Sequence, residues 1–185
     1  SSAVDFPKLV TDRGPALTAE HGAGAIGTAF APKTFRWIEN GRIITEIHVD
    51  ITGLGCKGDA QGDAIGLAAG GAAYIGRYVV GDYGIVHRIE MICLETPTED
   101  TATFEQDIDL MAEDDGDVAY DGPVDDTVIA AARDWEIGEM AVNNTPKLTA
   151  NDYFYLGEGD VGATTGVYGA GQFIIRCYGM PALVA

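Results

Sequence analysis

Apolar and polar positions alternate most clearly near the C-terminus, in the stretch VYGAGQFIIRCYG. Phe173, Ile175 and Cys177 fall on one parity, whereas Gln172 and Arg176 fall on the other. A period of two residues is typical of a β-strand that buries one face. The stretch therefore predicts a strand near the end of the chain.

A hairpin is predicted between TFRWIE and RIITEIHVDI, because Asn40–Gly41 joins them. Asn-Gly is a strong signal for a two-residue turn between antiparallel strands. In the second run, Ile47 and Val49 alternate with Glu46 and His48, which again indicates one apolar face.

Further segments along the chain are strand candidates. AAYIGRYVV and GIVHRIEMICLE are separated by turn residues 81–84, and we expect Pro97 to end the second of them. LTANDYFYL predicts another strand. DDTVIAAARDW fits either a short helix capped by Asp125 or Asp126, or a strand begun by its Thr-Val-Ile run, and both interpretations remain open.

The stretch TATFEQDIDLM alternates in the same way. Phe104, Ile108 and Leu110 share one parity, and Asp107 and Asp109 share the other. We therefore expect one face of this strand in the core and the two carboxylates in water.

Many short strands with turn signals about every 8–12 residues, and no alternation of strands with helices, predict an all-β fold. We expect an antiparallel, jelly-roll-like sandwich formed by residues 35–185 as one domain. At 185 residues the chain is long enough for a substantial core.

Residues 1–34 carry scattered Gly, Ala and Pro without a sustained period, and they predict an extended N-terminal arm. Phe6, Pro7, Leu9 and Val10 are its candidate contacts with a neighbouring subunit. The alternative is that these four side chains pack on their own domain.

The charge balance narrows the range of partners. The chain has 29 acidic and 11 basic residues and a net charge of −18, so it would repel a nucleic-acid backbone. No run approaches the ~20 apolar residues of a membrane span, and the N-terminus has no apolar signal segment. We expect a soluble protein that binds neither nucleic acid nor membrane.

Nucleophilic catalysis has little support in the sequence. Cys56, Cys93 and Cys177 are odd in number and widely spaced, so we expect reduced, buried thiols and synthesis in a reducing cytoplasm. Cys93 and His87 would lie ~20 Å apart along an extended strand, too far to act together. The two serines both stand at the N-terminus, which argues against a serine triad.

Cofactor and metal chemistry is equally poorly supported. The G-x-G-x-x-G motif at residues 22–27 lacks the preceding strand and the following helix that dinucleotide binding needs. A metalloenzyme on a cupin-like barrel would need a histidine cluster, and His21, His48 and His87 stand in separate contexts. We therefore predict no catalytic residue, no cofactor and no metal ligand.

The most acidic part of the chain is residues 98–132, with twelve carboxylates and no Lys or Arg. Their spacing does not match the alternating ligands and the closing glutamate of an EF-hand loop. We interpret the segment as a solvated acidic face, and the alternative of Ca²⁺ binding stays open.

A resemblance to small virion structural proteins of marine and other environmental tailed phages is carried by three segments. They are YFYLGEGDVGATTGVYGAGQFIIRCYG, GRIITEIHVDITGLGCKGDAQGDAIGL, and GGAAYIGRYVV followed by GIVHRIEMICLETPT. The resemblance covers roughly residues 40–180 and lies in the general character of the sequence and the order of its motifs.

The resemblance implies a decoration or cement protein on the exterior of the capsid, made in the host bacterial cytoplasm. Its expected partner is the major capsid protein, and its expected assembly is a homotrimer, with no cofactor. The alternative is a carbohydrate- or receptor-binding module of a fibre or vertex, which would use aromatic side chains as stacking platforms. The candidate platforms are Trp37, Tyr74, Tyr78, Trp135, Tyr153 and Tyr155.

Overall fold

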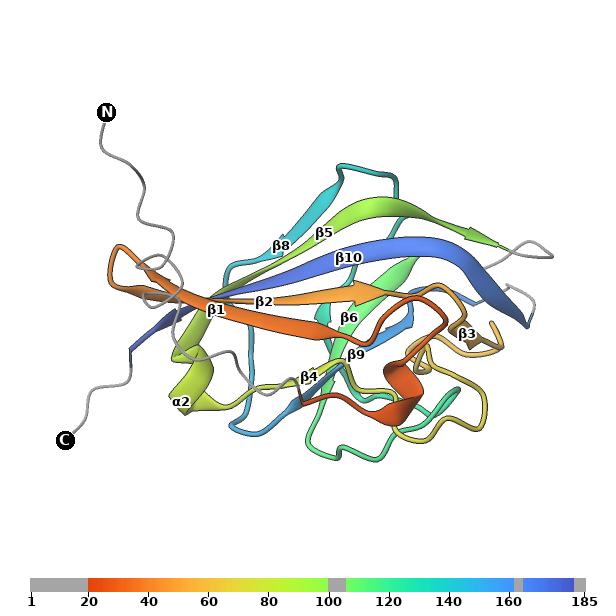
Figure 1. Ribbon diagram of the computed structural model, residues 1–185, viewed down its shortest axis with the longest axis horizontal. Coiled ribbons are helices and arrows are strands. Elements are labelled where there is room, and N and C mark those ends of the chain that lie inside the picture. Colours follow the sequence, from red (N-terminus) through yellow and green to blue (C-terminus); the bar gives the residue numbers. More distant parts are fainter. Residues whose placement is uncertain (1–19, 100–105, 162–164, 182–185) are drawn as a thin grey trace.

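The computed structural model describes residues 20–99, 106–161 and 165–181, which form two antiparallel β-sheets (Figure 1). The larger sheet has the strand order β1-β2-β10-β5-β8, with β3 paired to β10, and the smaller sheet has the order β4-β9-β6-β7. The predicted all-β, antiparallel class is confirmed. The elements are η1 (Ala23–Ala25), β1 (Lys33–Glu39), β2 (Arg42–Asp50), β3 (Gly55–Cys56), β4 (Gly76–Arg77), α2 (Val80–Tyr83), β5 (Ile85–Glu99), β6 (Ile108–Glu113), β7 (Asp126–Ile129), β8 (Met140–Asn143), β9 (Tyr153–Glu158) and β10 (Gly166–Met180).

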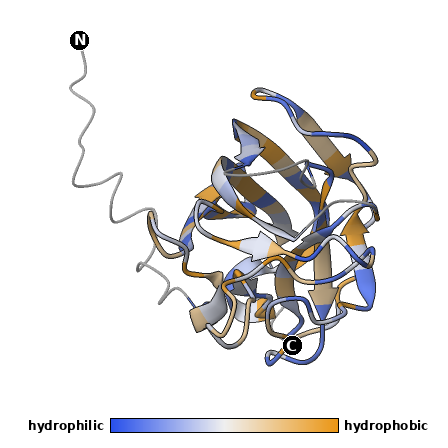
Figure 2. Cartoon of the chain, turned by 90° about the vertical axis from the view of Figure 1, so that its right-hand side faces the viewer, coloured by the Kyte–Doolittle hydropathy of each residue, from blue (hydrophilic) through white to orange (hydrophobic). Residues whose placement is uncertain are grey.

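The main core lies between the two sheets. Phe173, Ile175 and Cys177 of β10 are at most 1% exposed, and they belong to one cluster with Leu110 and Phe154 of the smaller sheet. Burying each large apolar side chain contributes about 1.5–3 kcal/mol to stability. Hydropathy alternates along the strands (Figure 2). The strand predicted from the C-terminal stretch is therefore confirmed.

Strands β1 and β2 form the predicted hairpin. Asn40 and Gly41 have φ angles of 50° and 75°, which are the positive values that a type I′ turn requires. Glu39 pairs with Arg42 directly across the turn, and the register then holds to the start of β1.

The prediction that Asp107 and Asp109 face water is wrong. They are 8% and 2% exposed, because the outer face of the smaller sheet is also covered. The loops from β3 to β4 and from β6 to β7 cross this face and bury a second cluster around Met111 and Tyr155. Asp109 accepts a hydrogen bond from the backbone N–H of Ala131 at 2.7 Å, and burial raises its pKa.

The segment AAYIGRYVV is mostly not a strand, contrary to expectation. Only Gly76–Arg77 form β4, and Val80–Tyr83 form the single helical turn α2. Tyr83 is 3% exposed, and the hydroxyl of Tyr78 donates to the carbonyl oxygen of Gly84 at 3.0 Å. These aromatic side chains fill one end of the sandwich, a role that local sequence does not distinguish from that of strand residues.

Pro97 does not end β5. The strand continues beyond it and pairs Thr98 with Ala170 beside an irregular part of β10. A proline is compatible with a strand at such a bulge, where a ladder hydrogen bond is missing. Residues 126–129, which fitted either helix or strand, form β7. Phe104 lies outside the described residues.

Residues 1–19 of the expected arm, with the candidate contacts Phe6, Pro7, Leu9 and Val10, also lie outside the described residues.

The described end of that segment packs against the domain. Ala25 is completely buried, and the N–H of Gly22 donates to the carbonyl oxygen of Tyr74 at 2.8 Å. The backbones approach so closely that a Cβ on Gly22 would lie 2.0 Å from the carbonyl oxygen of Ala72. The glycines of the G-x-G-x-x-G motif therefore permit close backbone packing.

Gly22→Ala should destabilise the fold, because the new methyl group overlaps the carbonyl oxygen of Ala72. Such overpacking lowers the free energy of unfolding by about 1–3 kcal/mol, which equilibrium urea denaturation measures. Gly81→Ala is the matched control, since a Cβ at this position of α2 meets nothing within 4 Å. Equal losses in the two variants would contradict the close packing of residues 20–25.

Candidate functional site

The outer face of the larger sheet carries exposed apolar side chains on both of its edge strands, β1 and β8. Because the strands are paired in register, side chains from neighbouring strands form rows across this face. One of them, which we call the outer-face row, takes one residue from each of β1, β2, β10, β5 and β8. In that order its members are Phe35, Glu46, Arg176, Glu90 and Val142.

An ion network occupies the middle of the outer-face row. Arg176 Nε donates to Glu46 Oε1 at 2.6 Å, and its Nη1 lies 3.5 Å from Glu90 Oε2. The two glutamates are only 8% and 5% exposed, so one guanidinium holds two carboxylates that would otherwise repel each other across β10. Burial alone would lower the pKa of Arg176, but the hydrogen bond to Glu46 raises it overall.

Three neighbouring side chains complete the network. His48 Nε2 lies 2.9 Å from Glu46 Oε2, and Arg88 Nη2 donates to Glu90 Oε1 at 2.6 Å. The hydroxyl of Tyr178 donates to Glu90 Oε2 at 2.8 Å, and burial together with this hydrogen bond raises the pKa of Tyr178. Every oxygen of the two carboxylates therefore has a partner.

Apolar side chains flank the network at both edges of the sheet. Phe35 is 45% exposed, and its ring centroid lies 4.9 Å from that of His48. Val142 and Met140 on β8 are 37% and 47% exposed. Aromatic residues, methionine and arginine are enriched in protein-binding surfaces, and this face presents all three beside charges that are already paired. We therefore take this face as the candidate functional surface.

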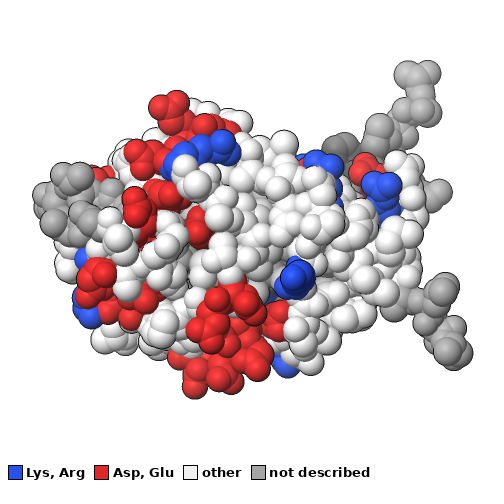
Figure 3. Space-filling model, turned by 180° about the vertical axis from the view of Figure 1, so that it is seen from behind, with Lys and Arg blue, Asp and Glu red and all other residues white. Residues whose placement is uncertain are grey.

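Acidic side chains gather on the opposite side of the molecule, which Figure 3 shows from behind. The exposed acids of the loop between β6 and β7 and the start of β7 are Asp114, Asp115, Asp117, Asp125 and Asp126. These residues are solvated, as expected. Asp107 and Asp109, by contrast, are buried.

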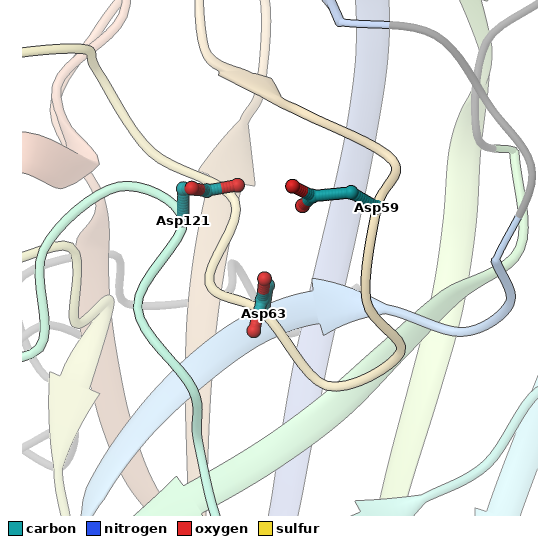
Figure 4. Close-up of side chains that lie close together, drawn as sticks. All are labelled: Asp59, Asp63 and Asp121. Carbon is teal, nitrogen blue, oxygen red and sulfur yellow. The ribbon is translucent and has the colours of Figure 1, made fainter.

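The acidic segment also contributes to a carboxylate cluster that sequence spacing did not reveal. Asp59, Asp63 and Asp121 each place one carboxylate oxygen within 4.8 Å of the others (Figure 4). Neither a histidine cluster nor EF-hand spacing marks these acids, because they come from two separate loops. A β-bridge between Asp63 and Pro123 joins the loops, and no local periodicity signals that contact.

The cysteines are poorly suited to catalysis. Cys56, Cys93 and Cys177 are buried thiols that form no disulfide, as expected for these described residues. Burial raises the pKa of Cys93 to about 11, so little of the reactive thiolate forms at neutral pH. Of the histidines, His48 belongs to the network on the outer face.

Three of the six candidate stacking platforms are not exposed, which corrects that part of the carbohydrate-binding alternative. Trp135 and Tyr155 are completely buried, and Tyr78 is 5% exposed. Trp135 also donates its indole N–H to a backbone carbonyl of β6 at 2.8 Å. Tyr74 and Tyr153 pack against each other, with ring centroids 4.8 Å apart.

Comparisons with known proteins found no match: no family description fits the chain, and no curated protein or solved structure is similar to it. Within residues 20–99, 106–161 and 165–181, no helix has the length and hydropathy needed to cross a membrane.

Arg176→Met should destabilise the protein more than Arg88→Met. Loss of Arg176 leaves two nearly buried carboxylates without their shared cation, which lowers the free energy of unfolding by about 1–3 kcal/mol. Arg88 pairs with one carboxylate, that of Glu90, and its side chain is 39% exposed, so its loss costs about 0–1 kcal/mol. Urea denaturation of both variants measures the difference, and similar losses would refute the central role of Arg176.

Proposed function

We propose that this chain is a decoration or cement protein that binds the outside of a phage head through the outer face of its larger sheet. The observation that carries the proposal is the outer-face row, in which exposed apolar side chains flank a satisfied ion network. The resemblance to virion structural proteins supports it and indicates the major capsid protein as the partner. A jelly-roll-like strand arrangement, assembly as a trimer and a purely structural, non-enzymatic role are parts of the same proposal.

The state of the ion network favours docking. Glu46 and Glu90 are already removed from water in the free protein, so a partner that covers them adds little desolvation penalty. Their oxygens are all paired, so docking traps no unsatisfied acceptor. The binding free energy then comes from burial of Phe35, Met140 and Val142, at about 25 cal/mol per Å² of apolar surface.

The distribution of charge suits one orientation on a shell. Figure 3 shows groups of acidic side chains on the face turned away from the viewer in Figure 1, and the exposed acids between β6 and β7 belong to the smaller sheet. Docking through the larger sheet directs these acids toward solvent, where a net charge of −18 favours solubility of the particle.

The energetic role of such a protein is mass action. A protein that binds the assembled shell, and not its separated subunits, stabilises the shell by an amount that grows with occupancy and affinity. Linked subunits that engage neighbouring sites together multiply a modest contact. A small apolar surface is therefore sufficient for a decoration protein.

Quantitative mass spectrometry of purified particles of the encoding phage should find this chain at a copy number equal to, or a simple fraction of, that of the major capsid protein. The copy number of a protein that decorates the whole shell must be proportional to the number of capsid subunits. A few tens of copies would contradict decoration and favour a vertex or fibre with a receptor-binding role. Absence from the particle would overturn a virion function altogether.

Phe35→Asp should weaken binding of the purified protein to undecorated heads about tenfold or more, because it places an unpaired charge in the docking surface. Cosedimentation with the heads measures the affinity. Val161→Asp is the control, since Val161 is 55% exposed in the loop after β9, away from the outer-face row. Equal binding by the two variants would rule out this face as the docking surface, whatever the copy number.

A further inference from the structure

The loops that cover the smaller sheet hold three carboxylates around one space (Figure 4). Asp59 and Asp63 lie between β3 and β4, and Asp121 lies between β6 and β7. One oxygen of each residue lies within 4.8 Å of the other two. Calcium binds oxygen ligands at about 2.3–2.6 Å, so oxygens up to about 5 Å apart can share one ion.

Backbone hydrogen bonds fix the two loops relative to each other. The N–H of Ala64 donates to the carbonyl oxygen of Gly122 at 2.8 Å, and the N–H of Asp121 donates to the carbonyl oxygen of Ala64 at 2.9 Å. The N–H of Gly62 donates to the carbonyl oxygen of Glu158 on β9 at 2.8 Å. The two loops therefore hold the three carboxylates in place in the ion-free protein.

The environment of Asp63 itself indicates a ligand. Asp63 is 8% exposed, and its carboxylate points between those of Asp59 and Asp121 (Figure 4). Within the described residues, no N–H or O–H group donates a hydrogen bond to this carboxylate. The Oδ1 atom of Asp121 is also buried without a hydrogen-bond partner. A buried carboxylate oxygen without a donor, such as Asp121 Oδ1, is costly unless a cation or a proton neutralises it.

One lysine provides only part of that neutralisation. Lys57 Nζ contacts Asp121 Oδ2, and the lysine side chain is 48% exposed. This pairing leaves the charges of Asp59 and Asp63 unbalanced. Three carboxylates and one ammonium therefore leave an excess of two negative charges in the ion-free protein, which attracts a cation.

A fourth acid increases the negative potential below the cluster. Glu158 is completely buried, and its Oε1 accepts a hydrogen bond from the N–H of Gly58 at 3.0 Å. Burial raises the pKa of Glu158, and the charges of Asp63 and Asp121 add to the effect. Burial likewise raises the pKa of Asp63, with contributions from Asp121 and Asp59.

We propose that Asp59, Asp63 and Asp121 bind one Ca²⁺ ion. Calcium prefers carboxylate oxygens, and water on the exposed side of Asp59 completes its 6–8 ligands. Magnesium needs near-ideal octahedral geometry at about 2.0–2.1 Å, which carboxylates fixed on two braced loops satisfy less readily. Lys57 pairs with Asp121 in the calcium-free protein and leaves when the ion binds, as its flexible stem allows.

Calcium bound in this way joins two loops that meet only in the native fold, so it stabilises the native state by mass action. The ion lies over the smaller sheet, on the side opposite the outer-face row. The calcium proposal therefore does not depend on the proposed function.

Thermal unfolding of the full chain in CaCl₂ tests the proposal. Calcium at about 10–100 times its Kd should raise Tm by about 3–8 °C, and titration calorimetry should find one site per chain. NaCl at equal ionic strength and MgCl₂ are measured in parallel, because a net charge of −18 responds to any salt. An equal rise in NaCl, or an equal or larger rise in MgCl₂, would overturn the proposal.

Substitutions locate the ion. Asp63→Asn and Asp121→Asn should abolish the calcium-dependent rise in Tm, whereas Asp117→Asn, which changes an exposed acid of the loop between β6 and β7, should retain it. Asp63→Asn should fold at least as stably as the parent without calcium, because it removes a repelled, buried charge. Lys57→Met should increase calcium affinity several-fold, because it removes the competing cation. An undiminished response in Asp63→Asn, or weaker binding in Lys57→Met, would overturn the assignment.

Discussion

The pairing of β10 with β2 on one side and β5 on the other constrains the rest of the structure. Alternate residues of β10 point into the core, and among them Phe173 and Cys177 pack against the smaller sheet. Because side chains alternate with a period of two, the same register places Arg176 on the other face, between Glu46 and Glu90. A shift by one residue would put the guanidinium in the core and Phe173 in water. The register of β10 therefore determines both the core packing and the outer ion network.

The outer faces of the two sheets are covered by loops to different extents. The smaller sheet is covered by its own loops, and both Asp109 of β6 and Asp63 of a covering loop are buried there. The larger sheet leaves its face open and removes two glutamates from water by surrounding them with partners from adjacent strands. One side of the molecule is thus closed, whereas the other has satisfied charges and open apolar edges. This asymmetry is the physical basis for proposing a single docking direction.

Local sequence was sufficient to predict the features that depend only on residues close together in the chain. The hairpin at Asn40–Gly41 and the parity of β10 followed from turn chemistry and a period of two. The prediction for Asp109 failed because whether the second face of a strand meets water depends on loops that are remote in sequence. The prediction of a strand at AAYIGRYVV failed for a related reason. Aromatic side chains that close the end of a sandwich resemble strand residues in composition.

The candidate sites depend on contacts that sequence alone does not encode in any local pattern. Glu46 and Arg176 are separated by 130 positions, and only the strand order β2-β10-β5 places the arginine between two glutamates. In so acidic a chain, a single aspartate carries little information. Asp63 and Asp117 both follow a glycine in the sequence, yet the first is buried without a hydrogen-bond donor from the described residues and the second is solvated. A missing partner in a buried position, more than acidity, is what distinguishes a metal ligand from a surface charge.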